Sequence, residues 1–163
     1  TLFPYTTLFR SGMKAHIGVD ADSGLVHTVV GTAANVNDVT QAHALVHGAE
    51  TDVFADAGYR GVEKRKEIQA QHPDVNWHIA MMPGKRKALD KSKALDALID
   101  QLETIKARIR AKVEHPFRVI KCQFGHRKVR YKGLAKNTSQ LLVMFALSNL
   151  WMVRKRILQG QQA

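Results

Sequence analysis

Residues 13–32 read MKAHIGVDADSGLVHTVVGT, and they are the most informative part of the chain for its fold. Apolar and polar side chains alternate from Met13 to Val19, which is the period of a half-buried strand. Asp22-Ser23-Gly24 is typical of a turn, and Leu25 to Thr32 is rich in valine and threonine. We therefore expect a β-hairpin here.

The following fifty residues predict alternating helices and strands. The expected elements are a helix capped by Asn37 or Asp38 and stopped at Gly48, a strand at Val53 to Ala57, a helix at Glu63 to Gln71, and a strand at Trp77 to Met82 closed by a Pro83-Gly84 turn. Strands that alternate with helices indicate an α/β fold, a mixed sheet with helices packed against it.

The last eighty residues predict helices. One apolar stripe with helical spacing comprises Leu95, Leu98, Ile99, Leu102, Ile105, Ile109, Val113, Phe117, Ile120 and Phe124. Because the spacing survives Pro116, we expect a kink near Glu114 or His115. A final helix, capped by Asn137 or Thr138, is apolar almost all round and is therefore expected to be buried.

The chain has 163 residues, a formal charge of +11 and one cysteine, Cys122. This length suits one domain. A single cysteine excludes an internal disulfide framework and is typical of a reducing cytoplasm. The longest nearly apolar run, Leu141 to Val153, is shorter than the roughly 18–20 residues that cross a bilayer. We expect a cytoplasmic protein that is not inserted in a membrane.

The positive charge is concentrated in the second half of the chain. Residues 1–83 contain 6 basic and 9 acidic side chains, whereas residues 84–163 contain 19 basic and 5 acidic ones. Eleven of the basic residues lie between Lys106 and Lys136, with Glu114 as the one acid among them. Such a density favours a nucleic-acid partner, because neutralised phosphates release counterions. A solvated basic helix face is the alternative.

Two acidic residues stand out for chemistry. On a helix with about 100° per residue, Arg110, Glu114, Arg118 and Lys121 share one face beside the apolar stripe. Asp56 lies near the end of a predicted buried strand. Carboxylates that converge on Mg²⁺ or Mn²⁺ are typical of phosphodiester chemistry, and neighbouring cations hold the DNA backbone. An ion-paired surface glutamate is the alternative reading of Glu114.

The residues around these two acids resemble the catalytic motifs of DDE transposases from bacterial insertion sequences. Asp56-Ala57-Gly58-Tyr59-Arg60-Gly61 is similar to the segment around the second catalytic aspartate. Arg110, Glu114 and Lys121 are similar in spacing to the third-carboxylate signature. Gly12-Met13-Lys14-Ala15-His16 and Tyr131-Lys132-Gly133-Leu134 also resemble family segments, so the resemblance covers about residues 12–158.

The resemblance implies a ribonuclease H-like fold and a DNA transposase. The implied reaction is metal-dependent strand cleavage at transposon ends, followed by attack of the freed 3′-hydroxyl on target DNA. Asp56 and Glu114 would be catalytic metal ligands for Mg²⁺ or Mn²⁺. The expected DNA contacts are Arg110, Arg118, Lys121, Arg127, Lys128, Arg130 and Lys132. The implied partners are double-stranded DNA and, in the full-length parent, a second copy, in a bacterial cytoplasm at the nucleoid.

The first eleven residues depart from the family pattern. They read TLFPYTTLFRS and resemble translated sequencing-adapter DNA, so we interpret residues 1–11 as non-native, 12–158 as a partial catalytic domain and 159–163 as a tail. The family's first catalytic aspartate lies just upstream of Gly12, where this chain has no acid. We therefore expect a sheet whose first strand is missing, an incomplete triad and a chain that is inactive alone.

Other assignments remain open at this point. Asp20 or Asp22 could replace the missing acid, although both flank a turn in which aspartate is favoured for local hydrogen bonds. His43 and His47, four residues apart, could bind a transition metal, although a pair on a helix surface is the simpler reading. The alternatives to an enzyme are a non-catalytic basic DNA-binding module and a basic RNA-binding or ribosomal accessory protein, which would explain the charge but not the two acids.

Overall fold

The β-hairpin predicted from residues 13–32 is the centre of the sheet in the computed structural model, which describes residues 1–3, 5–6 and 12–160. Strand β3 (Met13–Val19) pairs with the antiparallel strand β4 (Val26–Ala33) along its whole length. In the turn, Asp20 Oδ1 accepts hydrogen bonds from the N–H and the hydroxyl of Ser23, both at 2.6 Å. The predicted hairpin is confirmed.

The other edge of β3 pairs with residues 2–3 and 5–6, which belong to the segment that we interpret as non-native. Strands β1 (Leu2–Phe3) and β2 (Tyr5–Thr6) pair antiparallel with β3 in one common register, and β1 also pairs in parallel with β5 (Asp52–Ala55). We expected the first strand to be missing and this edge to be unpaired. Backbone hydrogen bonds need no particular side chain, so these residues fill that place although they contain no acid.

The sheet runs in the order β4, β3, β1 with β2, β5 and β6 (Asn76–Ile79), and mixes parallel with antiparallel pairs. It therefore has the expected mixed α/β architecture. Because β5 is parallel to β1 and β1 is antiparallel to β3, the sheet has two distinct ends. We call the end at which β5 and β6 finish the Asp56 edge, and the end at which β3 finishes the Asp20 edge.

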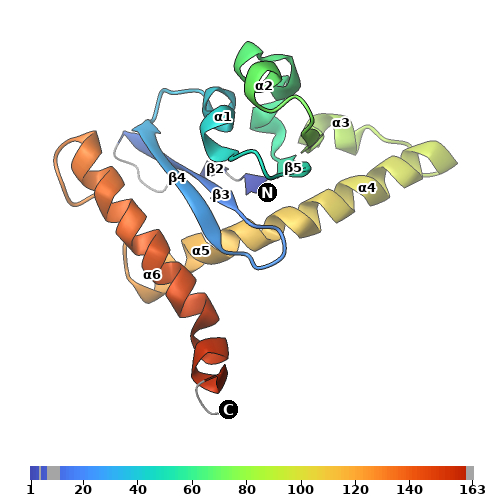
Figure 1. The fold of residues 1–163 in the computed structure, drawn as a ribbon. Helices are drawn as coiled ribbons and strands as arrows, with labels where there is room; N and C mark the ends of the chain where they lie inside the picture. Colours follow the sequence, from blue (N-terminus) through green and yellow to red (C-terminus); the bar gives the residue numbers. More distant parts are fainter. Residues whose placement is uncertain (4, 7–11, 161–163) are drawn as a thin grey trace.

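Short helices cover one face of the sheet (Figure 1). They are η1 (Asp38–Gln41), α1 (Ala42–Leu45), η2 (Ala57–Tyr59), η3 (Val62–Lys64), α2 (Lys66–Gln71) and α3 (Pro83–Lys87). Apolar residues of α1, η2, η3 and α2 form a second core with the strands, consisting of Ala42, Leu45, Val46, Val53, Ala55, Tyr59, Val62 and Ile68, whereas α3 has no buried residue and its Arg86 binds Asp100 of the helix at 94–110. The predicted Pro83-Gly84 turn is wrong, because Pro83 starts α3, where its fixed φ and missing N–H are tolerated.

A long helical segment crosses the other face. It consists of α4 (Ala94–Arg110), the 3₁₀ turn η4 (Ala111–Val113), α5 (Glu114–Arg118) and the π-helical turn η5 (Val119–Gln123). The chain stays helical through Pro116, which lies in the first turn of α5. A 3₁₀ turn lies just before Glu114, where we expected a kink, which stays a prediction.

This segment and the C-terminal helix α6 (Leu134–Gly160) form the first core with the hairpin. Its buried members are Met13, Ala15, Ile17, Val19, Val26, Val113, Phe117, Ile120, Leu141 and Phe145. The rings of Phe117 and Phe145 meet edge to face at 5.3 Å between centroids. Only the second half of the predicted apolar stripe is used, because α4 projects away from the sheet (Figure 1) and leaves Leu95, Leu98, Leu102 and Ile105 exposed.

Two expectations for the last helix are wrong. The helix starts at Leu134, and the Asn137 amide lies inside its first turn, where Nδ2 donates to the carbonyls of Tyr131 and Gly133 at 2.7 Å. The helix is also not buried all round, because only one side of it faces the hairpin and Leu142, Val143, Leu147 and Leu150 are exposed. No helix within the described ranges is both long enough and apolar enough to span a bilayer.

Candidate active site

Asp56 lies directly after β5, at the start of the 3₁₀ helix η2. Its Oδ1 accepts the N–H of Gly58 at 2.8 Å, which fixes the orientation of the carboxylate. Val53 and Ala55 pack in the second core, whereas Phe54 packs against the first. The backbone is still extended at Asp56, where β5 is followed by η2, whose Tyr59 packs in the second core.

A second carboxylate lies close to Asp56. A Cβ at Gly58 would lie 3.0 Å from Asp56 Oδ1 and 3.6 Å from Asp38 Oδ2, so both acids approach the same point. Burial raises the pKa of the Tyr59 phenol, and the charges of Asp38 and Asp56 raise it further. The Asp56 edge is therefore a place where negative charge accumulates.

Asp38 itself is buried and ion-paired. Its Oδ1 accepts a hydrogen bond from Lys14 Nζ at 3.2 Å and lies 3.7 Å from Nδ1 of the buried His16. The sequence suggested only a cap for this residue, and no side-chain cap bond is formed at Asn37. The alternation of β3 could have indicated such a partner, because Lys14 and His16 alternate with the core residues and so lie on the other, covered face of the sheet.

Glu114 is exposed on the helical segment that crosses the sheet. Earlier on this segment, Glu103 Oε2 accepts the N–H of Met81, just beyond β6 at the Asp56 edge, at 2.8 Å. On the other side, Lys112 Nζ donates to the carbonyl of Ala21 at the Asp20 edge. With 3.6 residues per turn, positions 103 and 114 fall on one side of the helix and position 112 on the opposite side. Glu114 therefore projects from the side of the segment roughly opposite Lys112.

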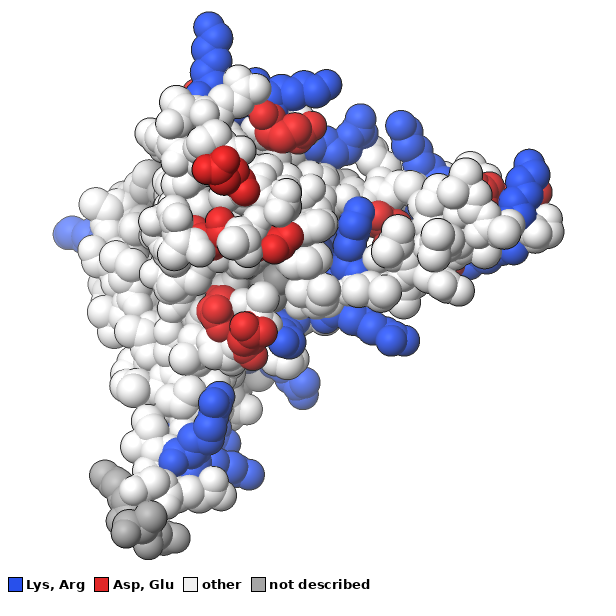
Figure 2. All heavy atoms as spheres, turned by 45° about the vertical axis from the view of Figure 1, so that its right-hand side comes forward, with Lys and Arg blue, Asp and Glu red and all other residues white. Residues whose placement is uncertain are grey.

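The predicted DNA-contacting residues are spread along the helical segment and the loop that follows it, and Arg118 lines a hollow with Ser23 of the hairpin turn and Trp151 of α6. Arg110 and Lys121 are half-buried, and Lys121 Nζ lies 5.9 Å from the centroid of the Phe117 ring. Arg118 is exposed, as are four cations of the basic loop, residues 126–133: Arg127, Lys128, Arg130 and Lys132. On the face of the molecule that Figure 2 shows, acidic side chains gather at the centre and basic side chains lie at the periphery.

A family model described as the transposase DDE domain matches residues 5–150. The chain belongs to this family. No solved structure matches it. The mixed sheet with helices on both faces is the ribonuclease H-like arrangement expected of a DDE domain, and the family assignment makes this chain a transposase domain whose substrate is DNA.

DDE transposases use a divalent metal ion, and the donors near the Asp56 edge suit one. Carboxylate oxygens are the ligands that Mg²⁺ and Mn²⁺ prefer, and Asp56 and Asp38 present such oxygens near Gly58. Within the described ranges, however, these acids are not among the groups of three side chains whose ligand atoms are close enough to share one metal ion. Such a group is found at another place in the molecule.

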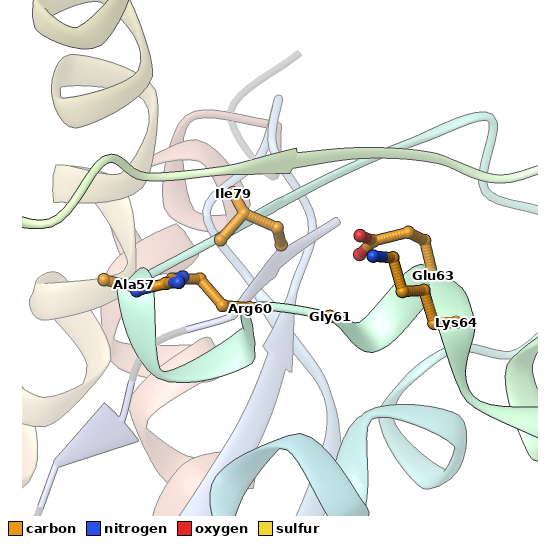
Figure 3. Close-up of a pocket in the computed structure, with 6 residues that line it drawn as sticks. All are labelled: Ala57, Arg60, Gly61, Glu63, Lys64 and Ile79. Carbon is orange, nitrogen blue, oxygen red and sulfur yellow. The ribbon is translucent and has the colours of Figure 1, made fainter.

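The DDE domain has an open hollow of about 580 Å³ beside Asp56. It is lined by residues that follow the aspartate, namely Ala57, Arg60, Gly61, Glu63 and Lys64, together with Ile79 of β6. Figure 3 shows Ile79 between the Ala57 and Arg60 side and the Glu63 and Lys64 side of the hollow. Arg60 Nη1 lies 2.7 Å from Sδ of Met82, so this cation is anchored near the end of β6.

Asp20 and Asp22 lie at the wrong end of the sheet to replace the missing acid. Both follow β3 at the Asp20 edge, whereas Asp56 follows β5 at the opposite edge. Hydrogen bonds from the hydroxyl and N–H of Ser23 lower the pKa of the Asp20 carboxyl. Asp20 is a turn residue of the hairpin.

Proposed function

We propose that this transposase domain holds a divalent metal ion, Mg²⁺ or Mn²⁺, through Asp56 and Glu114. The single observation that supports this is the orientation of the long helical segment. Glu103 binds the backbone just beyond β6, at the edge at which β5 ends in Asp56, and on a regular helix Glu114 would fall on the same side as Glu103.

The roles of the residues follow from their chemistry. A bound hard cation would lower the pKa of a water molecule and neutralise charge on the oxygens of the scissile phosphate. The Gly58 N–H keeps the Asp56 carboxylate in one orientation. Arg110 and Lys121, one turn before and two turns after Glu114, would bind phosphate oxygens next to it.

The DNA surface extends from these residues to Arg118 and the basic loop. The exposed guanidinium and ammonium groups of Arg118, Arg127, Lys128, Arg130 and Lys132 suit the phosphate backbone of a duplex. We propose that transposon ends and target DNA bind here in a homodimer of the full-length parent. A protein with this substrate would act at the nucleoid, in the bacterial cytoplasm.

Strand cleavage and 3′-hydroxyl transfer are proposed for the parent and not for this chain alone. Residues 1–11 contain no acid, so the strand position next to β3 and β5 supplies no third carboxylate. Losing one ligand of a metal site lowers activity by orders of magnitude. The lack of an acid in residues 1–11 also favours the second candidate function, a non-catalytic DNA-binding module.

The test is a comparison of duplex binding and nicking, with a transposon-end duplex and Mg²⁺ or Mn²⁺. The proteins are the unmodified chain, Asp56→Asn, Glu114→Gln and the control Glu67→Gln, in which an exposed acid of α2 is neutralised. We expect salt-sensitive duplex binding by all four. We also expect Mn²⁺ binding, measured by electron paramagnetic resonance, to be weakened in the Asp56 and Glu114 variants and unchanged in the Glu67 variant.

The nicking results separate the functions. Nicking that either site substitution abolishes supports catalysis, and binding without nicking supports the binding module. Authentic nicking that survives both substitutions would overturn the site. A preference for structured RNA over duplex DNA would favour the RNA-binding alternative.

A further inference from the structure

Three metal-ligating side chains meet at the end of the sheet opposite Asp56. They are His27 at the start of β4, and His47 and Glu50 from the loop between α1 and β5. One ligand atom from each lies within 4.8 Å of the other two. We call these three residues the histidine cluster. His43 and His47, which we expected on the surface of one helix, are not on the same helix, because α1 ends at Leu45 and Val46 is extended.

Glu50 is the anchor of this cluster. Its side chain is only 5% exposed, and its carboxylate accepts the N–H of His47 at 3.2 Å and that of Gly48 at 2.9 Å. Gly48 has a φ of +93°, a conformation that favours glycine, and the turn it allows brings His47 Nε2 to 3.4 Å from Glu50 Oε1. The carboxylate is thus held in place before any ion binds.

His27 presents one particular nitrogen to the cluster. Its Nδ1 lies 2.9 Å from Thr28 Oγ1, so a hydrogen bond there leaves Nε2 as the ligand. Its ring meets that of His47 edge to face at 4.5 Å. The ring is packed tightly on β3, since a Cβ at Gly18 would lie 2.5 Å from His27 Cε1. Metal-binding histidines commonly have such a hydrogen-bond partner on the other ring nitrogen, which fixes the orientation of the ring.

The surroundings favour a cation. The cluster borders a hollow of about 680 Å³ that Asp20, Asp22 and Asp52 also line, together with Thr1, whose N-terminal ammonium group donates to the carbonyl of Asp52 at 2.9 Å. The Thr1 hydroxyl donates to Glu50 Oε1 at 3.1 Å and lies 3.5 Å from His27 Nε2, so the space between the ligands already accommodates an oxygen.

We infer that His27, His47 and Glu50 bind one transition-metal ion of the zinc type. Two imidazoles and a carboxylate are a ligand set for Zn²⁺ and related ions, whereas Mg²⁺ prefers oxygen ligands alone. The ion would link the start of β4 to the loop before β5, across the Asp20 edge. Its role is structural, because Asp56 lies at the other edge of the sheet.

The experiment measures Zn²⁺ binding by competition with a chromogenic chelator in a millimolar excess of Mg²⁺. Co²⁺ replaces Zn²⁺ where visible absorption is needed to report nitrogen ligation. The expected result is one Zn²⁺ per chain, a Tm that rises with Zn²⁺ concentration, and reversal by a chelator. His47→Ala and Glu50→Gln should each weaken binding by at least about 10-fold, the effect of losing even a supporting partner.

Matched controls keep the result specific. His47 is 52% exposed, so its substitution leaves the fold intact even where Glu50→Gln disturbs it. His43→Ala removes a neighbouring histidine, Thr1→Ala removes the hydroxyl contact, and the double variant Asp56→Asn with Glu114→Gln removes the acids of the proposed active site. All three should bind Zn²⁺ as the unmodified chain does. Zn²⁺ binding that survives His47→Ala, is lost in the Asp56 and Glu114 double variant, or never raises the Tm would overturn the inference.

Discussion

Lys14 and Asp38 form an ion pair that is largely removed from water, with side chains 13% and 12% exposed. Replacing Lys14 by Met leaves the Asp38 carboxylate buried without that partner. We expect the free energy of unfolding to fall by roughly 3 kcal/mol, the lower end for a broken buried pair. Urea denaturation measures this. The matched control is Arg65→Ala, whose pair with Glu67 is exposed and worth less than about 1 kcal/mol. Equal losses in the two variants would contradict the prediction.

His16 gives stability a dependence on pH. Burial lowers its pKa below the ordinary value of 6.5, Lys14 lowers it further, and Asp38 opposes both. Because the unfolded chain takes up the proton first, stability is complete above about pH 6.5 and falls as the pH drops toward the lower folded pKa. We expect Tm to decrease from pH 7.5 to 5.5, and less steeply in His16→Gln. His43→Gln is the control, and an unchanged slope in the His16 variant would count against this account.

At the scale of elements, the apolar stripe of the long helical segment divides into two unlike halves. Phe117 is buried between β3 and α6, whereas Leu98 and Leu102 are more than half exposed. We expect Phe117→Ala to reduce the free energy of unfolding by about 3–5 kcal/mol through the cavity it leaves. Leu98→Gln and Leu102→Gln should each change it by no more than about 0.5 kcal/mol. Urea denaturation compares them, and a large loss at Leu98 would show that α4 is covered in solution.

The elements also show how far the sequence could be read. The hairpin, β5, β6 and the helical segment through Pro116 were predictable, because period-2 and period-3.6 patterns are local. The exposure of α4 and α6 was not, because one apolar stripe looks the same whether or not a sheet lies opposite it. Asp56 and Glu114 are site predictions that rest on local motifs, whereas Asp38 and the histidine cluster depend on contacts between residues far apart in the chain.

For the whole molecule, the uneven charge predicts how DNA binding responds to salt. A duplex should bind with an affinity that falls linearly in log–log form as salt rises, since each neutralised phosphate releases counterions. Arg127→Ala and Lys128→Ala should each weaken binding and lower the slope by about 1. Lys66→Ala, on α2, is the control and should alter neither. Fluorescence anisotropy at several salt concentrations measures both quantities, and a slope unaffected by either loop variant would exclude the basic loop from the interface.

The short strands β1 and β2 separate the architecture of the sheet from its chemistry. β1 joins β3 to β5 through backbone hydrogen bonds, β2 extends the pairing with β3, and the segment contains no acid. A strand at this position therefore completes the sheet whether or not it carries a carboxylate. The same backbone pairing would hold a strand of any sequence at this position, with or without a carboxylate.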